Sequence, residues 1–488
     1  MRSPSAAFTA SRFGLGLRPT GSDVFGRDPV AALLDEVEIE ARAPAGQALP
    51  TSREIFSGVQ THLARVAEMK KASRALVMGE TGASPADDGS AGMRPGSGEA
   101  DDPGMMQAEA RAADKPEKPQ RPQVDAYNAE FEALIARKHD APIGFYERLV
   151  DFWSNHFAIE KDRNPRVMAI VGAYEREAIR PHVLGRFEDM LLAVAQHPAM
   201  LYYLDNYLSA GVHSRAARRR RKLGLNENYG REMLELHTLG ADGGYDQSDV
   251  RALANALSGW GIVVNPRRPD CGTFAFFASV HEPGPVTIMG KVYAQKGEAQ
   301  ARAVMADLAR HPATARHIAF KLAQAFVADD PPKPLVARLA AVFERTGGDL
   351  GALAKALVTD PAAWDAPRRK LRTPQEFVWS SIRALPAKYE FRDIRRSLAM
   401  LGQTPWSPTS PAGFPGDSRH WLAADAMTNR LDFAQFLAAR THPENPVMLA
   451  EATLGDLLTG PTREALMRAE SPRQAFALML MSPEFQRR

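Results

Sequence analysis

The chain has 488 residues, of which 44% are hydrophobic and 24% are charged. This is an ordinary globular composition, with enough apolar material for a substantial core. The formal net charge of +3 excludes a strongly basic nucleic-acid-binding protein, and a single cysteine, Cys271, excludes an intrachain disulfide and a cysteine-cluster metal site.

The N-terminal segment from Met1 to Gly16 lacks the apolar stretch that a secretory leader needs. No later window approaches the ~20 apolar residues of a membrane-spanning helix. We therefore expect a soluble, cytoplasmic chain with no membrane span. A leader that is absent from this sequence would instead place the protein in the periplasm or outside the cell.

Residues 1–70 are predicted to be a helical part of the core. Val30, Leu33, Leu34 and Val37 recur at i, i+3, i+4 and i+7, which is the pattern of one buried helix face. Residues 71–125 differ, because most of this segment is rich in Gly, Pro, Ala, Ser and Asp and poor in branched and aromatic residues. Such a composition buries too little apolar surface to offset the entropy of ordering, so we expect a disordered or low-complexity insertion.

From residue 126 onward, apolar residues recur with a period of about 3.6, which indicates helices. One helix is predicted from Val250, with Asp246 as its N-cap and Asp249 completing a capping box. Further helices are expected over residues 299–310, 312–328, 334–346, 349–359, 374–385 and 472–481. The predicted fold is mainly α, a multi-helical bundle or array, in which residues 126–488 form the main helical domain and residues 1–70 belong to the same domain.

Two segments depart from the helical pattern. The aromatic run 273–280 and the apolar run 286–289 flank turn residues, so a small β-hairpin is predicted near 273–290. Residues 403–421 are rich in Pro, Gly and Trp, and we expect an ordered loop there because its large aromatic side chains need a surface to pack on.

The segment from Asn226 to Gly240 carries the densest polar chemistry of the chain. As a helix with Asn226 as N-cap and about 100° per residue, it places Asn228, Glu232 and Glu235 on one stripe, with Arg231 at its edge. Tyr229, Met233, Leu236 and His237 lie on the adjacent apolar face. Two carboxylates one turn apart share a metal or act as an acid/base pair when burial separates their pKa values. The alternative is a solvated acidic stripe with ion pairs to Arg231.

Other candidates lie outside this segment. His156 and His237 lie on apolar helix faces, so each is either a core histidine or a functional group. His281 precedes Glu282 at the predicted hairpin turn, and Asp205 with Asn206 ends a helix, where a C-terminal turn is the structural alternative.

A basic run precedes the Asn226–Gly240 segment, at residues 215–222. It is either a solvated loop or an attractor for an anionic ligand. No aromatic residues alternate with these charges, so we do not expect nucleic acid as a partner. The sequence also has no Walker A loop, no Rossmann fingerprint, no His-Glu-x-x-His and no Gly-x-Ser-x-Gly motif.

Several blocks together resemble one bacterial family, catalogued as domain of unknown function 1800. The resemblance rests on Arg12–Gly16, Phe152–Phe157, Arg180–Phe187, His197–Asn206, Asn226–Gly240, Gly244–Tyr245, Ser258–Trp260, His311–Arg316 and the Pro-Gly loop near 411–416. It implies a mostly helical fold and no established activity. It groups as motif positions His156, Asp205, Asn206, Asn226, Glu227, Arg231, Glu232, Glu235, His237 and His281.

The sequence departs from the family pattern near the predicted hairpin. The pattern has His-Asp followed by a lysine, whereas this chain has His281-Glu282 and Val286-Thr287 at the corresponding positions. The acid is retained in kind, and the contact made by that lysine is not expected here.

The first functional hypothesis is a hydrolase that uses paired carboxylates on a polar polymer, with glycans as the leading substrate. Glu232 and Glu235 would be the acid/base pair and Asp205 an alternative carboxylate. Residues expected to position or stack on the substrate are Asn228, Arg231, Asn206, Trp153, Tyr202, Tyr229, Trp406 and His281. An anionic or glycan ligand near the loop 215–222 is the expected partner, and no cofactor is required.

Two alternatives remain open. One is a metal-binding enzyme, in which a divalent cation is held by Glu232, Glu235 and His237 together with His156 or His281. The other is a non-catalytic helical scaffold or interaction protein whose polar network sets the helix register.

Overall fold

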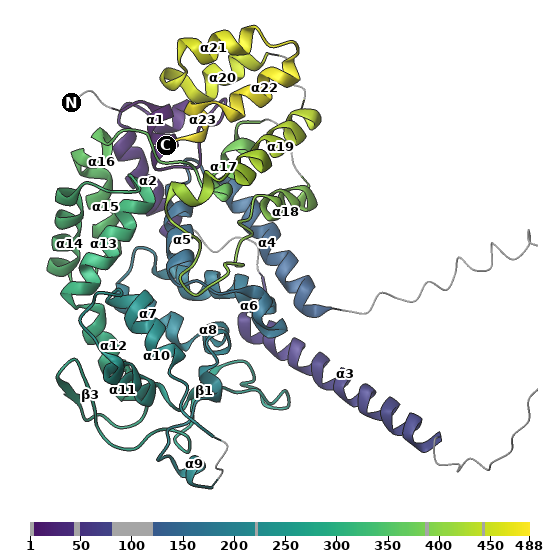
Figure 1. Ribbon diagram of the computed structural model, residues 1–488, viewed down its shortest axis with the longest axis vertical. Helices are drawn as coiled ribbons and strands as arrows, with labels where there is room; N and C mark the ends of the chain where they lie inside the picture. The colour runs from purple at the N-terminus through teal and green to yellow at the C-terminus, as the bar shows by residue number, and fades with distance from the viewer. Residues whose placement is uncertain (1–3, 43–48, 81–120, 220–222, 386–389, 442–444) are drawn as a thin grey trace, which may run out of the picture.

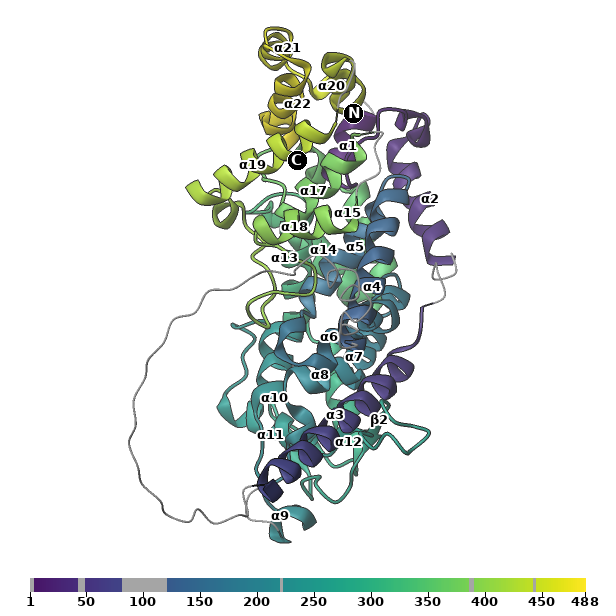
Figure 2. The ribbon, with the colours of Figure 1, turned by 90° about the vertical axis from the view of Figure 1, so that its right-hand side faces the viewer.

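The computed structural model describes residues 4–42, 49–80, 121–219, 223–385, 390–441 and 445–488. It is mainly helical, as predicted, and elongated (Figures 1 and 2). The N-terminal helices α1 (Ala6–Arg12) and α2 (Pro29–Arg42) lie near the C-terminal helices at one end. None of the helices in the described ranges is long and apolar enough to cross a membrane.

The long helix α3 (Ser52–Glu80) and helix α4 (Pro122–Asp140) flank the predicted insertion. Residues 71–80 are therefore helical, contrary to the prediction, and residues 122–125 are helical too. Lys, Ala, Arg, Leu and Met in 71–80 are strong helix formers, and the average composition of 71–125 concealed them. Residues 81–120 lie outside the described residues.

The middle of the molecule is built on helix α6 (Pro165–Tyr174), which packs against α3, α4 and α8. The neighbouring elements are α5 (Phe145–His156), η2 (Lys161–Arg163), the π-helical turn η3 (Glu175–Ile179), η4 (Arg180–His182), α7 (Phe187–Gln196), α8 (Pro198–Tyr203) and η5 (Asn206–Leu208). Prolines start the second of two successive helices at Pro198 and Pro312, where the preceding histidine caps the new helix.

The Asn226–Gly240 segment is not one regular α-helix. It consists of α10 (Asn228–Glu232) and the π-helical turn η6 (Met233–Thr238). Asn226 lies one residue before the observed N-cap, Glu227, and its side chain accepts a hydrogen bond from Asn228 N (2.9 Å). Helix α11 (Gln247–Leu257) follows, with the predicted Asp246–Asp249 capping box.

Two small antiparallel sheets replace the single predicted hairpin. Strand β1 (Trp260–Ile262) pairs with β2 (Phe274–Phe276), and β3 (Val286–Ile288) pairs with β4 (Lys291–Tyr293). The prediction of strands near 273–290 holds, but their pairing was wrong. The Met289-Gly290 turn, with positive φ at both residues, joins β3 directly to β4.

The remaining helices are α9 (Arg215–Arg219), α12 (Glu298–Ala309), α13 (Pro312–Phe326), α14 (Lys333–Thr346), α15 (Leu350–Thr359), α16 (Pro361–Asp365), α17 (Pro374–Arg383), α18 (Phe391–Met400), α19 (Ala424–Arg440), α20 (Pro446–Leu454), α21 (Gly460–Met467), α22 (Pro472–Met481) and α23 (Pro483–Gln486). Helices α12, α13, α14, α15, α17 and α22 follow the predicted ranges closely, and the other remaining helices had no predicted range. Short 3-10 turns are η1 (Ser22–Phe25), η7 (Ser418–Trp421) and η8 (Gly455–Leu457).

One contiguous hydrophobic core joins the N-terminal and main parts of the chain. Phe13, Phe145 and Phe326 illustrate this, because their ring centroids lie 5.7 to 6.2 Å apart although they come from α1's C-terminal end, α5 and α13. Packing of α5 against α13 also brings together the faces that line the site described next.

Candidate functional site

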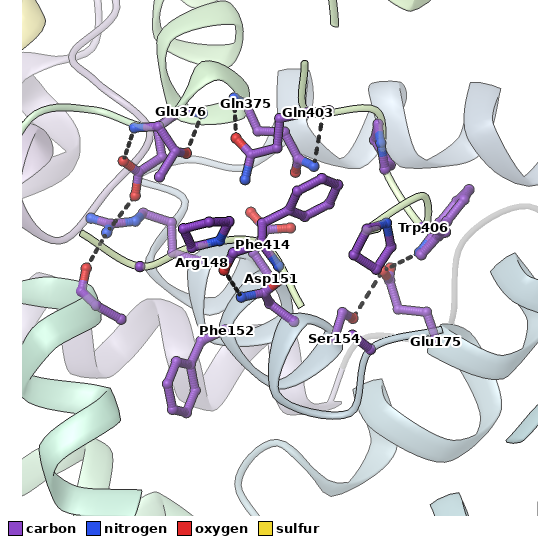
Figure 3. Close-up of a pocket in the computed structure, with 18 of the residues that line it drawn as sticks. Arg148, Asp151, Phe152, Ser154, Glu175, Gln375, Glu376, Gln403, Trp406 and Phe414 are labelled. Atoms are coloured by element: carbon purple, nitrogen blue, oxygen red, sulfur yellow. Dashed lines mark hydrogen bonds and ion pairs between the residues drawn. The ribbon is translucent and has the colours of Figure 1, made fainter. Parts of the chain in front are cut away.

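Two adjoining cavities lie beneath the loop of residues 402–421, which we term the covering loop. The larger, the lysine cavity, has a volume of about 490 Å³ and is lined from α5, α13 and the covering loop. The smaller, the carboxylate cavity, has a volume of about 140 Å³ and is lined from α5, η3, α17 and the same loop (Figure 3). The two abut, because both are lined by Phe152, Asn155, Ala325, Phe414, Pro415 and Gly416.

The covering loop is attached to α5 through Asn155. The Asn155 side chain accepts a hydrogen bond from Phe414 N (2.7 Å) and donates one to Phe414 O (3.0 Å). The neighbouring Gly413 has φ +82°, and a Cβ atom there would lie 2.4 Å from the Asn155 carbonyl oxygen. Only glycine permits this approach, so the sequence at 413 fits the loop to α5.

Trp406 fixes the other side of the covering loop. Its indole N–H donates to Glu175 Oε2 (2.9 Å), and its carbonyl accepts from Lys161 N (2.8 Å). Its φ of +56° is unfavourable for a bulky side chain, so these contacts hold a strained backbone. Figure 3 shows Trp406 and Glu175 at one end of the carboxylate cavity, and Arg148 and Glu376 at the other.

Lys321 and His156 form the central contact of the lysine cavity. Lys321 Nζ donates to His156 Nδ1 (3.0 Å), and His156 Nε2 faces the carbonyl oxygen of His237 (3.1 Å). A carbonyl oxygen only accepts, so the hydrogen-bond pattern assigns the proton to Nε2 and the lone pair to Nδ1. Burial, and then the charge of Lys321, lower the pKa of His156 well below its usual value, which keeps this imidazole neutral.

The Lys321 amine has an unusual electrostatic setting. Burial lowers its pKa to about 8. Among the described residues, no carboxylate lies within ion-pair distance of Lys321, whereas Lys370 pairs with Asp329 at 2.6 Å. The lining of the lysine cavity contains no Asp or Glu. An ammonium group in such a place is partly desolvated and lacks a counter-ion.

The C-terminal end of the Asn226–Gly240 segment orients two imidazoles. Helix ends leave carbonyl groups without intrahelical partners. The carbonyl of His237 accepts from His156, and that of Leu236 lies 3.3 Å from His317 Nε2, whose pKa burial lowers to about 4. The π-helical turn, with Leu239 N bonded to Leu234 O, shapes this end.

The carboxylate cavity contains one carboxyl group that titrates near neutral pH. Burial raises the pKa of Asp151 to about 6, against the attraction of Lys138 Nζ at 2.7 Å. Burial also raises the pKa of Glu376, but Arg488 and Arg148 outweigh it and hold the value at about 2. Asp151 is therefore the cavity's candidate for proton transfer, and Glu376 remains an anion in an ion-pair network.

The carboxylates predicted from the sequence lie elsewhere. Glu232 and Glu235 are half-buried and line neither cavity. Burial and the charge of Glu235 raise the pKa of Glu232. Asp205 pairs with Arg163 (2.7 Å) in a left-handed turn, and Arg231 bonds Gln247 (2.9 Å).

Most of the predicted substrate-contacting residues are buried. The rings of Trp153, Tyr202 and Tyr229 are 2%, 4% and 0% exposed, so they present little surface to a ligand. Asn206 is buried and donates to Trp260 O (3.0 Å), while Asn228 is exposed. Trp406 alone of this set lines a cavity, with its indole N–H already bonded.

The remaining sequence candidates do not form a metal centre. His281 Nδ1 lies 2.8 Å from the Ser258 carbonyl, and His156 is bonded at both ring nitrogens. In the ranges that the structure describes, no three His, Cys, Asp or Glu side chains are placed to hold a metal. Of the basic run, Arg215, Arg218 and Arg219 are exposed on α9, at the far end of the molecule in Figure 1, and 220–222 lie outside the described residues.

Sequence reasoning missed Asn155, Asp151 and Lys321, which line the cavities, and it also missed His317 as a polar residue of α13. His317 and Lys321 lie four residues apart within an apolar helix, so they share one face of α13. A lysine within that pattern was the available signal. Its pairing with His156 joins positions 165 residues apart and has no local signature.

The fold and the site together define a mainly helical protein with two adjoining cavities beneath the covering loop. Residues 9–487 match the family described as protein of unknown function (DUF1800), and the chain belongs to this family. A search found no curated protein and no solved structure that matches the chain. The family has no known function, so the chemistry of the two cavities follows from the residues that line them.

Proposed function

We propose that the protein is an enzyme whose reactive group is the Lys321 amine in the lysine cavity. The observation that supports this is the chain of contacts from Lys321 Nζ to His156 Nδ1 and from His156 Nε2 to the His237 carbonyl. A reactive group hydrogen-bonded to a partner that a third group orients is the arrangement of activated nucleophiles.

The electrostatics support the same proposal. With a pKa of about 8, Lys321 carries an uncharged amine in roughly a tenth of the molecules at pH 7. Groups with pKa values near the working pH are the most effective in proton transfer, and desolvated lysines are effective nucleophiles. Asp151, with a pKa of about 6 in the adjoining cavity, supplies a second group that titrates in this range.

The proposal is tested by measuring the reactivity of each lysine. The full-length protein is treated with limiting acetic anhydride across the neutral and alkaline range, and modified peptides are quantified by mass spectrometry. We expect Lys321 to react with a midpoint near pH 8, and the exposed Lys355 serves as the reference lysine in the same sample. A Lys321 profile that coincides with that of Lys355, or no modification of Lys321 at any pH, would contradict the proposal.

A second candidate function is the glycan hydrolase with Glu232 and Glu235 as acid/base pair. The observation that favours it is the raised pKa of Glu232, caused by burial and by the neighbouring Glu235. The exposed arginines of α9 would attract an anionic polymer.

Release of reducing ends from a panel of neutral and acidic polysaccharides tests this candidate. Activity that is lost in Glu232→Gln but kept in Glu227→Gln would support it, since Glu227 lies on the same segment and pairs with Arg251. Activity that survives Glu232→Gln with an unchanged melting temperature would count against it.

A further inference from the structure

We infer that the lysine cavity binds a small carbonyl compound that carries its own anionic group, and that Lys321 forms an imine with it. This inference rests on the proposed function of Lys321 as the reactive amine. It adds the substrate class, which follows from the charge balance of the cavity, its polar lining and its size.

The charge balance among the described residues favours a negative group supplied by the ligand. Whether as an ammonium or as a protonated imine, Lys321 N carries a positive charge. The carboxylates that line the cleft, Asp151, Glu175 and Glu376, belong to the carboxylate cavity and already contact Lys138, Trp406 and Arg148 respectively. In the part of the chain that the structure describes, no carboxylate lines the lysine cavity. A ligand with its own carboxylate or phosphate would balance this charge without the cost of burying a second protein side chain.

The covering loop provides hydroxyl groups to the lysine cavity. Thr409, Ser410 and His420 line the cavity, and Ser407 also lines it but already donates its hydroxyl to Asp162 Oδ2 (2.9 Å). Hydroxyl groups donate to carboxylate and phosphate oxygens without adding charge. The volume of about 490 Å³ lies within the range of small-molecule sites.

The chemical step is balanced without an oxidant or a reductant. The uncharged Nζ attacks the carbonyl carbon, and one proton moves from nitrogen to oxygen to give the neutral carbinolamine. One further proton, taken up from solvent by the hydroxyl group, lets water leave and gives the protonated imine. One N–H bond of Lys321 points at His156 Nδ1, so a neutral imidazole orients the amine. This imidazole does not compete with the amine for the carbonyl carbon of the ligand. Hydrolysis reverses the step and restores the amine.

The test uses pyridoxal 5′-phosphate as the anionic aldehyde and pyridoxal as its neutral counterpart. Full-length protein is incubated with each, reduced with borohydride, and the modified lysines are located by mass spectrometry. We expect reduced adduct at Lys321 at a concentration at least about tenfold lower for the phosphate than for pyridoxal, or about 1.4 kcal/mol in binding. Lys321→Arg should lose this adduct, and Lys355→Arg should keep it.

A second probe separates the two anion types. Glyoxylate is an aldehyde that carries a carboxylate, and its reduced adduct at Lys321 is compared with that of pyridoxal 5′-phosphate. Preferential capture of either anion over a neutral aldehyde supports the inference and names the group. Ser410→Ala should reduce the preference of Lys321 for the anionic aldehydes over pyridoxal.

The outcomes distinguish this inference from the proposed function. If Lys321 acetylates near pH 8 but captures pyridoxal and pyridoxal 5′-phosphate equally, the inference of an anionic substrate is wrong. The proposal that Lys321 is the reactive amine then still stands. A Lys321 that neither acetylates near pH 8 nor forms any reduced adduct overturns both. If Lys321→Arg does not fold, the pH midpoint of adduct formation in the wild-type chain decides, and a midpoint like that of Lys355 overturns the inference.

Discussion

At the scale of single residues, two buried lysines show how the surroundings decide what an amine does. Lys138 lies 2.7 Å from Asp151 and 3.2 Å from Glu147, so its charge is balanced and it links helices α4 and α5. Lys321 has a neutral imidazole as its partner and a cavity beside it. The first is a structural ion pair, and the second is a charge that the fold leaves unbalanced.

This contrast predicts opposite effects of the same substitution. Lys321→Met should raise the free energy of unfolding at pH 7 by ~1–3 kcal/mol, because it removes a desolvated charge. Lys138→Met should lower it by ~3–5 kcal/mol, because it leaves carboxylates buried without their partner. Chemical denaturation of both variants measures the two effects, and a destabilised Lys321→Met variant would show that the amine has an unrecognised counter-ion.

The protonation of Lys321 also predicts how the free energy of unfolding depends on pH. The pKa of Lys321 is lower in the folded chain than its usual 10.5, so the unfolded chain binds more protons between about pH 8 and 10.5. The contribution of this group to stability therefore rises with pH across that window. The rise should be absent in Lys321→Met.

His237 gives a second pH prediction. Burial, and then the charge of Lys321, lower the pKa of His237 to about 3, so the folded chain keeps it neutral while the unfolded chain protonates below about 6.5. Stability from this group is present above pH 6.5 and is lost as the pH falls toward 3. In His237→Leu the acid slope of the unfolding free energy should decrease by up to ~1.4 kcal/mol per pH unit.

The His237 variant also separates side chain from backbone. The hydrogen bond to His156 uses the carbonyl oxygen of residue 237, so the Lys321 acetylation midpoint should stay near 8 in His237→Leu. A large change in that midpoint would show that the imidazole ring itself tunes Lys321.

At the scale of elements, the covering loop and the turn at 233–238 decide the site. The sequence stripe of Glu232 and Glu235 was drawn for a regular α-helix, but the π-helical turn η6 changes the angle from Met233 onward. The group of this segment that contacts the lining of the lysine cavity is the carbonyl of His237, which is bonded to His156, rather than a carboxylate. The covering loop then encloses the space between α5 and α13.

Two glycines of the covering loop make a matched test. Gly413 and Gly402 have φ of +82° and +79°, but a Cβ atom at 413 would clash with Asn155 O, and one at 402 would meet no atom within 4 Å. Gly413→Ala should displace the loop and move the Lys321 midpoint at least about one pH unit toward the value of an exposed lysine. Gly402→Ala introduces only the conformational strain of a positive φ at alanine, so the Lys321 acetylation midpoint should stay unchanged. Equal midpoints in both variants would show that the loop does not desolvate Lys321.

At the scale of the whole molecule, the site depends on a core shared by distant parts of the chain. Phe13 packs against Phe145 and Phe326, next to the helices that carry His156 and Lys321. We expect residues 4–42 to unfold together with the main helical part, in one cooperative transition.

Phe13→Ala tests this coupling. It should destabilise the protein by ~3–5 kcal/mol, because it removes a fully buried ring, and it should shift the single transition as a whole. Phe277→Ala, at a half-exposed ring, should cost at most about 1 kcal/mol. A separate early transition in Phe13→Ala, seen by calorimetry, would indicate that the N-terminal helices form an independent unit.

Local patterns determined much of this protein from sequence alone. The predicted helix ranges, the Asp246–Asp249 capping box and the family follow from signals within a few turns of chain, since periodicity, capping and turn chemistry act between near neighbours. Strand pairing and the cleft were decided by tertiary structure. No strand was predicted for β1, and Lys321, His156 and Phe414 meet only when α5, α13 and the covering loop pack. The physical reason is that desolvation and contacts between distant residues set the pKa of Lys321, and neither exists until the core has formed.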